Sequence, residues 1–179
     1  MKLKAIIVSL KGTKLSNREK FLLSKEKPWG VILFKRNLKS FDQIKNLTSK
    51  IRKITKNTKF PIIIDEEGET VSRLSNIINH NITANFFGKL FLKDKKFCLK
   101  ILKHYIYALS NILRQLGINI NTIPVLDIIR HNTNKIIGNR SFSKEKKIVK
   151  TLGKYTINYL HLNKISAIIK HIPGHGRAK

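Results

Sequence analysis

The sequence predicts an α/β fold in which helices cover a parallel sheet. Short runs of isoleucine, valine and leucine alternate with longer segments whose apolar residues recur every three or four positions. The short runs do not alternate with polar residues, which is typical of strands that are covered on both faces. The predicted strands are residues 5–10, 31–34, 61–64, 118–126 and 165–169.

Helix start signals lie between the first three predicted strands. Ser16 followed by Glu19, and Ser40 followed by Gln43, match the capping-box pattern. In this pattern each of the two side chains satisfies a backbone N–H group that the first helical turn leaves free. We therefore expect one helix to begin after Ser16 and another to begin after Ser40.

Two longer helices are predicted in the second half of the chain, at about residues 95–116 and 143–162. Gly117 follows the first of them, where a left-handed residue commonly ends a helix. Strand and helix thus alternate along the whole chain, so the sheet should be parallel with right-handed crossovers. A doubly wound open sheet and a (β/α)8 barrel both fit this order.

Length and charge limit the domain organisation and the partners. A chain of 179 residues can form one domain with its own core, and we treat residues 1–179 as one domain. The net charge of +27 taken alone favours nucleic acid or an anionic surface as a partner. However, the excess is mostly lysine and is spread along the chain, and no aromatic-rich strand motif is present to stack bases. We therefore expect solvated helix faces and no specific nucleic-acid partner.

The sequence also contains signals about the compartment. It has no run of 18 apolar residues, so we expect no membrane-spanning helix. The first 14 residues, MKLKAIIVSLKGTK, lack the length and cleavage site of a signal peptide. The single cysteine, Cys98, lies on the apolar face of a predicted helix and should be buried. Together these features favour a reducing, cytoplasmic setting.

Polar side chains follow four of the predicted strands. In a parallel barrel the carboxyl ends of all strands lie on one face, where ligands bind. Charged residues that directly continue apolar runs need a partner or a ligand, because an isolated buried charge is strongly unfavourable. Any single position could instead be an ordinary solvated loop residue. The residues in question are Lys35, Arg36, Asn37, Asp65, Glu66, Glu67, Asp127, Lys170 and His171.

Two further interpretations concern acidic and histidine side chains. Glu66 and Glu67 are adjacent at a strand end, so they should point in opposite directions and cannot act as an acid/base pair on the two sides of one bond. Four histidines have no motif around them and are expected at the surface: His80, His104, His131 and His161.

Five segments, in order along the chain, resemble motifs of the bacterial β-N-acetylhexosaminidases of glycoside hydrolase family 3. GVILFKRN is similar to their G-x-I-L-F-x-R-N, and IIIDEEGETVSRL to their apolar run followed by D-Q-E-G-G-R-V-x-R. NTIPVLDI resembles A-P-V-L-D, IIGNRSFS resembles I-G-x-R-S-F, and IIKHIPGHG resembles K-H-F-P-G-H-G. The sequence departs from the family pattern at Glu66, Glu69 and Thr70, where glutamine, glycine and arginine usually stand.

The resemblance implies an incomplete (β/α)8 barrel with about five of its eight parallel strands. It implies that Asp65 accepts hydrogen bonds from sugar hydroxyls and that Arg73 and Arg140 line the same subsite. Lys170 and His171 would bind hydroxyls of the N-acetylglucosamine ring. The residues implied to shape the following loop are Pro173, Gly174, His175 and Gly176.

The implied reaction removes a terminal β-linked N-acetylglucosamine, from cell-wall muropeptides in the cytoplasm, with retention of configuration and without metal or cofactor. The Asp-Ser-His general acid/base element and the aspartate nucleophile are expected beyond Lys179. We therefore expect this chain to be inactive alone and, with open strand edges, prone to aggregate. The alternatives are another specificity within the family and a non-catalytic basic protein that binds sugar or nucleic acid. The acceptor, water or phosphate, and the oligomeric state stay open.

Overall fold

The computed structural model describes residues 3–177, in which five strands and five α-helices alternate for most of the chain. The strands are β1 (Lys4–Ser9), β2 (Pro28–Leu33), β3 (Ile62–Ile64), β4 (Ile120–Asn121) and β5 (Ser166–Ala167). The helices are α1 (Asn17–Phe21), α2 (Phe41–Thr55), α3 (Ala84–Lys93), α4 (Lys95–Gln115) and α5 (Lys146–Leu162). A π-helical turn covers Leu22–Glu26, and 3₁₀ turns cover Lys35–Asn37, Gly138–Arg140 and His175–Arg177.

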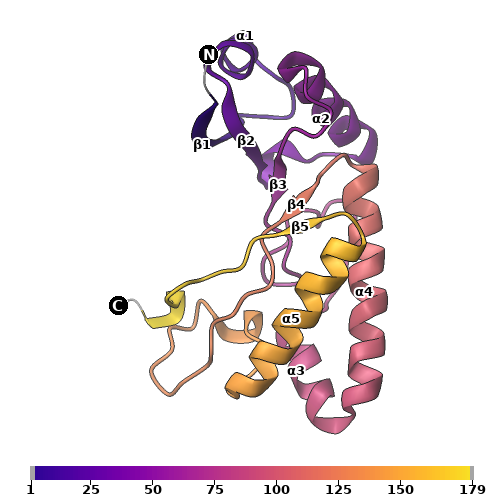
Figure 1. Ribbon diagram of the computed structural model, residues 1–179, viewed down its shortest axis with the longest axis vertical. Coiled ribbons are helices and arrows are strands. Elements are labelled where there is room, and N and C mark those ends of the chain that lie inside the picture. Colours follow the sequence, from indigo (N-terminus) through magenta and orange to yellow (C-terminus); the bar gives the residue numbers. More distant parts are fainter. Residues whose placement is uncertain (1–2, 178–179) are drawn as a thin grey trace.

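All neighbouring strands are parallel, and their order in the sheet is the order in the sequence, β1-β2-β3-β4-β5. A doubly wound sheet reverses its strand order at a switch point, and this sheet does not. Successive right-handed crossovers therefore bring the helices to one side of the sheet, where Figure 1 shows α2 and α4. The sheet is thus part of a barrel wall, as the family resemblance implied, and the doubly wound alternative is wrong.

Strand burial differs between the centre and the edge of the sheet. All three residues of β3 are buried, in agreement with the prediction of a strand covered on both faces. In β1 the prediction is wrong: Ile6 and Ile7 are each 47% exposed, although they point to opposite faces. The physical reason is that β1 is the first strand in the sheet and has only β2 as a neighbour.

The last two strands are shorter than predicted. The ladder between β4 and β5 stops at the pair Asn121 and Ala167, and one more parallel bridge joins Val125 to Lys170. Pro124 lies between these pairings and has no N–H to donate, so it interrupts the ladder. Nevertheless its carbonyl accepts from the Lys170 N–H at 3.2 Å, which keeps the chain after β5 beside the chain after β4.

Both predicted helix starts are confirmed, and one of the two predicted capping boxes is complete. Ser16 and Glu19 form a complete capping box. Ser40 caps α2 by accepting from the Gln43 N–H, but the Gln43 side chain accepts from the Lys39 N–H instead of the Ser40 N–H. The second capping box is therefore only half formed.

The remaining helices show one agreement and two differences. Gly117 follows α4 with φ of 74°, the left-handed conformation expected there. However, α5 begins at Lys146 rather than at residue 143, because the Ser143 hydroxyl accepts from the Glu145 N–H before the helix starts. The sequence analysis did not predict α3, which Thr83 caps. Among residues 3–177, no helix has both the length and the hydropathy needed to cross a membrane.

The core lies between the sheet and the helices, and Cys98 is fully buried in it as predicted. At one point α3 approaches backbone directly: a Cβ added to Gly88 would lie 1.6 Å from the Phe142 carbonyl oxygen. Phe142 closely follows the 3₁₀ turn Gly138–Arg140. The absence of a side chain at Gly88 therefore permits the packing that places Arg140.

Replacing Gly88 by alanine should destabilise the protein by about 2–3 kcal/mol, because the added methyl group forces α3 away from Phe142. Alanine has the better helix propensity, so the loss cannot come from the helix itself. Gly12→Ala is the control, since nothing lies within 4 Å of its Cβ position, and it should change stability by less than about 0.5 kcal/mol. Urea unfolding followed by Trp29 fluorescence measures both, and equal effects would contradict the packing argument.

Candidate functional site

Asp65 directly follows β3 and accepts hydrogen bonds from three other segments. Its carboxylate accepts from the Thr122 hydroxyl at 2.7 Å and from Arg73 Nη2 at 2.8 Å, and it forms an ion pair with Lys170. Burial raises the pKa of Asp65, but the bonds from Lys170, Thr122 and Arg73 outweigh burial, so the pKa lies below its ordinary value. The carboxylate is therefore charged and held in one orientation.

Glu67 lies two residues further on and joins the other cations of the site. Its carboxylate accepts from Arg140 Nε at 2.8 Å and from Arg140 Nη2 at 2.9 Å, which is a bidentate pair. Lys170 Nζ lies 2.5 Å from the same carboxylate, so one ammonium joins Glu67 to Asp65. These hydrogen bonds from Arg140 to Glu67 raise the pKa of the guanidinium. The sequence analysis placed Glu67 after a strand end but did not assign it a role in binding.

His171 is oriented by Asp127, which follows the bridge after β4. Asp127 Oδ2 lies 2.7 Å from His171 Nδ1 and also accepts from the His171 backbone N–H at 3.2 Å. Asp127 Oδ1 accepts from the Gly176 N–H at 3.1 Å, so the same carboxylate fixes the loop that follows. Burial raises the pKa of Asp127, but these bonds, that from His171 foremost, hold it below its ordinary value. The Nδ1–H bond leaves Nε2 facing Arg140 Nη2 at 3.5 Å.

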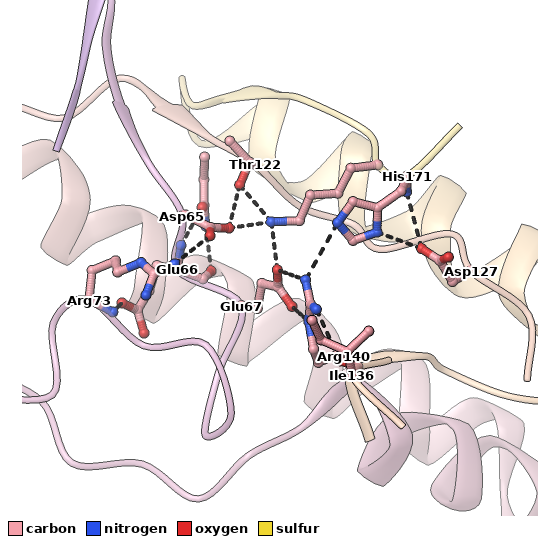
Figure 2. A network of polar contacts seen from close by, with 11 residues as sticks. Asp65, Glu66, Glu67, Arg73, Thr122, Asp127, Ile136, Arg140 and His171 are labelled. Carbon is pink, nitrogen blue, oxygen red and sulfur yellow. Dashed lines mark hydrogen bonds and ion pairs between the residues drawn. The ribbon is translucent and has the colours of Figure 1, made fainter. Parts of the chain in front are cut away.

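The structure brings all the residues predicted to bind sugar into one connected network (Figure 2). They come from the loops after β3, β4 and β5, at the carboxyl ends of the strands. Three side chains that form hydrogen bonds with the side chains of the predicted residues were not predicted as site residues: Glu67, Thr122 and Asp127. Glu67 and Asp127 had a signal in their positions after predicted strands, whereas Thr122 had none. The predicted residues are Asp65, Arg73, Arg140, Lys170 and His171.

The predicted loop residues lie beside this network. An open hollow is lined by Asp127, His171 and residues of the loop, among them Pro173, Gly174 and Gly176. The His175 ring lies 4.9 Å from the His171 ring, between centroids. Within residues 3–177, no group of three histidine, cysteine, aspartate or glutamate side chains is placed to hold a metal ion.

Two interpretations of isolated residues had different outcomes. Glu66 and Glu67 do separate: Glu66 is fully buried and accepts from the Arg73 and Leu74 N–H groups, whereas Glu67 contacts Arg140. The prediction of a surface position is wrong for His80, whose side chain is only 15% exposed and lies against Glu66. A segment without periodic pattern gives no signal for such burial. The other three histidines without motif context are exposed.

Comparison with known protein families identifies the fold. The family described as "Glycosyl hydrolase family 3 N terminal domain" matches residues 2–179. The chain belongs to glycosyl hydrolase family 3. This agrees with the parallel strand order and with polar groups gathered at the carboxyl ends of the strands.

The curated relatives of this family 3 domain carry the name Beta-hexosaminidase. One from Xanthomonas campestris pv. campestris (strain B100) is 30% identical over 171 residues, which are 96% of this chain and 51% of the relative. Another, from Hydrogenovibrio crunogenus (strain DSM 25203 / XCL-2), is 31% identical over 176 residues, covering 98% of this chain and 49% of the relative. The chain thus spans about half the length of the curated relatives it matches.

Solved structures of the family show the same fold. Native NagZ from Neisseria gonorrhoeae matches with a TM-score of 0.89 and 28% identity, over 98% of this chain and 51% of that chain. A family 3 β-N-acetylglucosaminidase from Paenibacillus sp. str. FPU-7 matches with a TM-score of 0.85 and 29% identity, over 95% of this chain and 32% of that one. These matches confirm the barrel-type α/β architecture.

Acid should weaken this family 3 domain through Asp65 and Asp127. Both pKa values lie below their ordinary range in the folded state, so the unfolded chain takes up protons first as the pH falls. The stability that they contribute is complete above about pH 5 and is lost as the pH falls through the folded pKa. Thermal unfolding between about pH 6 and pH 3 measures this loss. Asp65→Asn should show a shallower acid slope than the wild type, and equal slopes would refute the assignment to Asp65.

Proposed function

We propose that this chain forms the sugar-binding part of a β-N-acetylhexosaminidase site, which removes terminal β-linked N-acetylglucosamine with retention of configuration. The observation that carries the proposal is the paired network at the carboxyl ends of the strands, in which Lys170 joins Asp65 and Glu67 and the latter holds Arg140. Sugars offer several adjacent hydroxyls, and each can donate one hydrogen bond and accept others. Charged donors and acceptors held side by side suit that pattern.

The hydrogen-bond inventory supports particular roles in sugar binding. Lys170 has three N–H groups, and they face Asp65, Glu67 and Thr122. A sugar hydroxyl can therefore bind by exchange: it accepts from the lysine and donates to the aspartate, so both charges keep a partner. Arg73 contacts Asp65 through Nη2 alone, which leaves the other side of its guanidinium able to donate to the ring.

His171 has a defined orientation for the same task. Its Nδ1 faces Asp127, so in the neutral ring Nε2 is the acceptor and is turned toward Arg140. We propose that His171 and Arg140 bind a hydroxyl together with the other charged groups of the network. The loop from Pro173 to Gly176 then shapes one side of the sugar site.

The relatives support the choice of sugar. The curated relatives are named Beta-hexosaminidase, and NagZ from Neisseria gonorrhoeae has been solved in complex with N-trifluoroacetyl-D-glucosamine. We extend this to muropeptide fragments in the cytoplasm as the substrate. The 179 residues contain no Asp-Ser-His triplet, and we assign neither the general acid/base nor the nucleophile to any of them. A polypeptide of these residues should accordingly bind the sugar without cleaving its glycosides.

Sugar binding can be tested on the 179-residue chain with N-acetylglucosamine and ligand-observed saturation-transfer NMR. The wild type should bind, and Asp65→Asn should weaken binding about tenfold or more, because the charged acceptor is lost. Glu26→Gln is the control, since it removes a half-exposed carboxylate whose ion-pair partner within residues 3–177 is Lys4, and it should bind like the wild type.

Release of the aryl group from an aryl β-N-acetylglucosaminide tests the catalytic assignment in the same preparation. No release above background is expected. Cleavage by the 179-residue chain would overturn the assignment of acid/base and nucleophile to other residues. A folded wild type that shows no binding of N-acetylglucosamine would overturn the proposed sugar site.

A further inference from the structure

Behind the sugar site, Glu66, His80 and Tyr105 form a buried polar cluster. Glu66 is fully buried, and its Oε2 accepts from the backbone N–H groups of Arg73 and Leu74 at 2.7 and 2.8 Å. The other oxygen, Oε1, has no hydrogen-bond partner among the described residues and lies 3.4 Å from His80 Nε2. A buried carboxylate oxygen without a donor is strongly unfavourable, and the imidazole at 3.4 Å can supply one.

His80 is held in place by its other neighbours. Its ring packs edge-to-face on Tyr105 of α4, with centroids 5.8 Å apart. Burial and the charge of Glu66 raise the pKa of the Tyr105 hydroxyl, so the phenol stays neutral. Both ring nitrogens of His80 are buried without a hydrogen-bond partner in residues 3–177. The Nε2–H is thus free to serve Glu66 after a small movement.

Glu66 controls the backbone that carries the sugar-binding side chains. It stands between Asp65 and Glu67, and its side chain ties these residues to the backbone at Arg73. Its own backbone N–H and carbonyl are bonded to the side chain of Asn121 in β4, at 3.1 and 2.9 Å. Displacement of the Glu66 side chain would therefore move three residues of the site together.

The segment that carries His80 also touches this loop directly. The Glu69 N–H donates to the Ile82 carbonyl at 3.1 Å. A Cβ on Gly68 would lie 2.2 Å from the same carbonyl oxygen, and the His80 ring lies 3.8 Å from that position. Loop and segment are therefore in contact at Gly68 and Glu69 as well as at the Glu66 carboxylate.

We propose that His80 is a positioning residue of the sugar site: it donates to Glu66 and thereby holds the loop that carries Asp65, Glu67 and Arg73. The proposal rests on the proposed function, because sugar affinity is one of its readouts. His80 itself does not touch the sugar. Its effect passes through Glu66, so it should depend on the charge at that position.

A double-mutant cycle tests this dependence. His80→Phe keeps an aromatic ring against Tyr105 and removes the donor, whereas His80→Gln places an amide N–H near the position of Nε2. His80→Phe should weaken N-acetylglucosamine binding about tenfold, and His80→Gln should stay within about threefold of the wild type. In Glu66→Gln the buried charge is absent, so adding His80→Phe should change affinity less than about twofold. His104→Phe, at an exposed histidine of α4, is the control and should bind like the wild type.

A second readout does not depend on sugar and separates the two proposals. The Arg73 and Leu74 amides donate to Glu66, so their hydrogen exchange reports the anchor itself. In the chain that retains Glu66, His80→Phe should speed this exchange about tenfold. In the Glu66→Gln background, the same substitution should leave the exchange unchanged. If the wild type binds no sugar but the variants show this exchange pattern, the proposed function is refuted. The proposal that His80 supports Glu66 is then confirmed.

The remaining outcomes also decide the matter. If His80→Phe does not fold, the proposal requires that Glu66→Gln/His80→Phe does fold, and failure of both would overturn it. Equal losses for His80→Phe in the two backgrounds would show that the ring only fills space. Equal behaviour of His80→Phe and His80→Gln would likewise refute the donor role.

Discussion

The ion pair between Lys170 and Asp65 is the interaction on which the site depends. The two residues are 105 positions apart in the sequence, and each directly follows the apolar run that contains a strand. A charge at such a position is partly removed from water, so either residue without the other would be strongly unfavourable. The pair therefore forms only when β3 and β5 lie in one sheet with their carboxyl ends at the same edge. The site and the strand order support each other.

The ion pairs of the site contribute more to the orientation of its side chains than to the stability of the fold. A buried ion pair contributes little net free energy compared with apolar side chains of similar size, because both ions lose their hydration. What the network provides is orientation: Glu67 fixes the planar guanidinium of Arg140 through two parallel bonds, and Asp127 fixes the ring of His171. Side chains that are already ordered lose less conformational entropy when a ligand binds. A charged network that is complete before a ligand binds thus favours affinity and selectivity over stability.

The parts of the structure that depend on local rules could be predicted from the sequence. The cap at Ser16 and the left-handed Gly117 follow from the conformations that a helix end requires. The convergence of Asp65 with Lys170 follows from the rule that parallel strands end on one face. In contrast, the bond between Glu67 and Arg140 joins residues 73 positions apart, and no spacing or periodicity in the sequence signals it.

Two other failures have the same physical origin. The strand expected over residues 118–126 is interrupted at Pro124, which has no N–H to donate. This matters only once the segment pairs with a neighbouring strand, and that pairing is set by the tertiary structure. The exposure of β1 likewise depends on its place in the sheet and not on its composition. Sequence patterns describe what a segment can bury, whereas neighbours decide what it does bury.

The two adjacent glutamates show how a departure from the family pattern can be accommodated. Strand-like alternation sends Glu67 to the site and Glu66 inward, to the position at which the resembled motif D-Q-E-G-G-R-V-x-R has glutamine. A glutamine side chain at this position would be neutral and would need no charged partner. A buried carboxylate needs more donors than the two backbone N–H groups supply. His80 lies against the unsatisfied oxygen, in a segment where sequence alone predicted a surface histidine. Because Glu66 Oε1 lacks a hydrogen-bond donor and His80 can supply one, the two residues are best understood as a single feature of this chain.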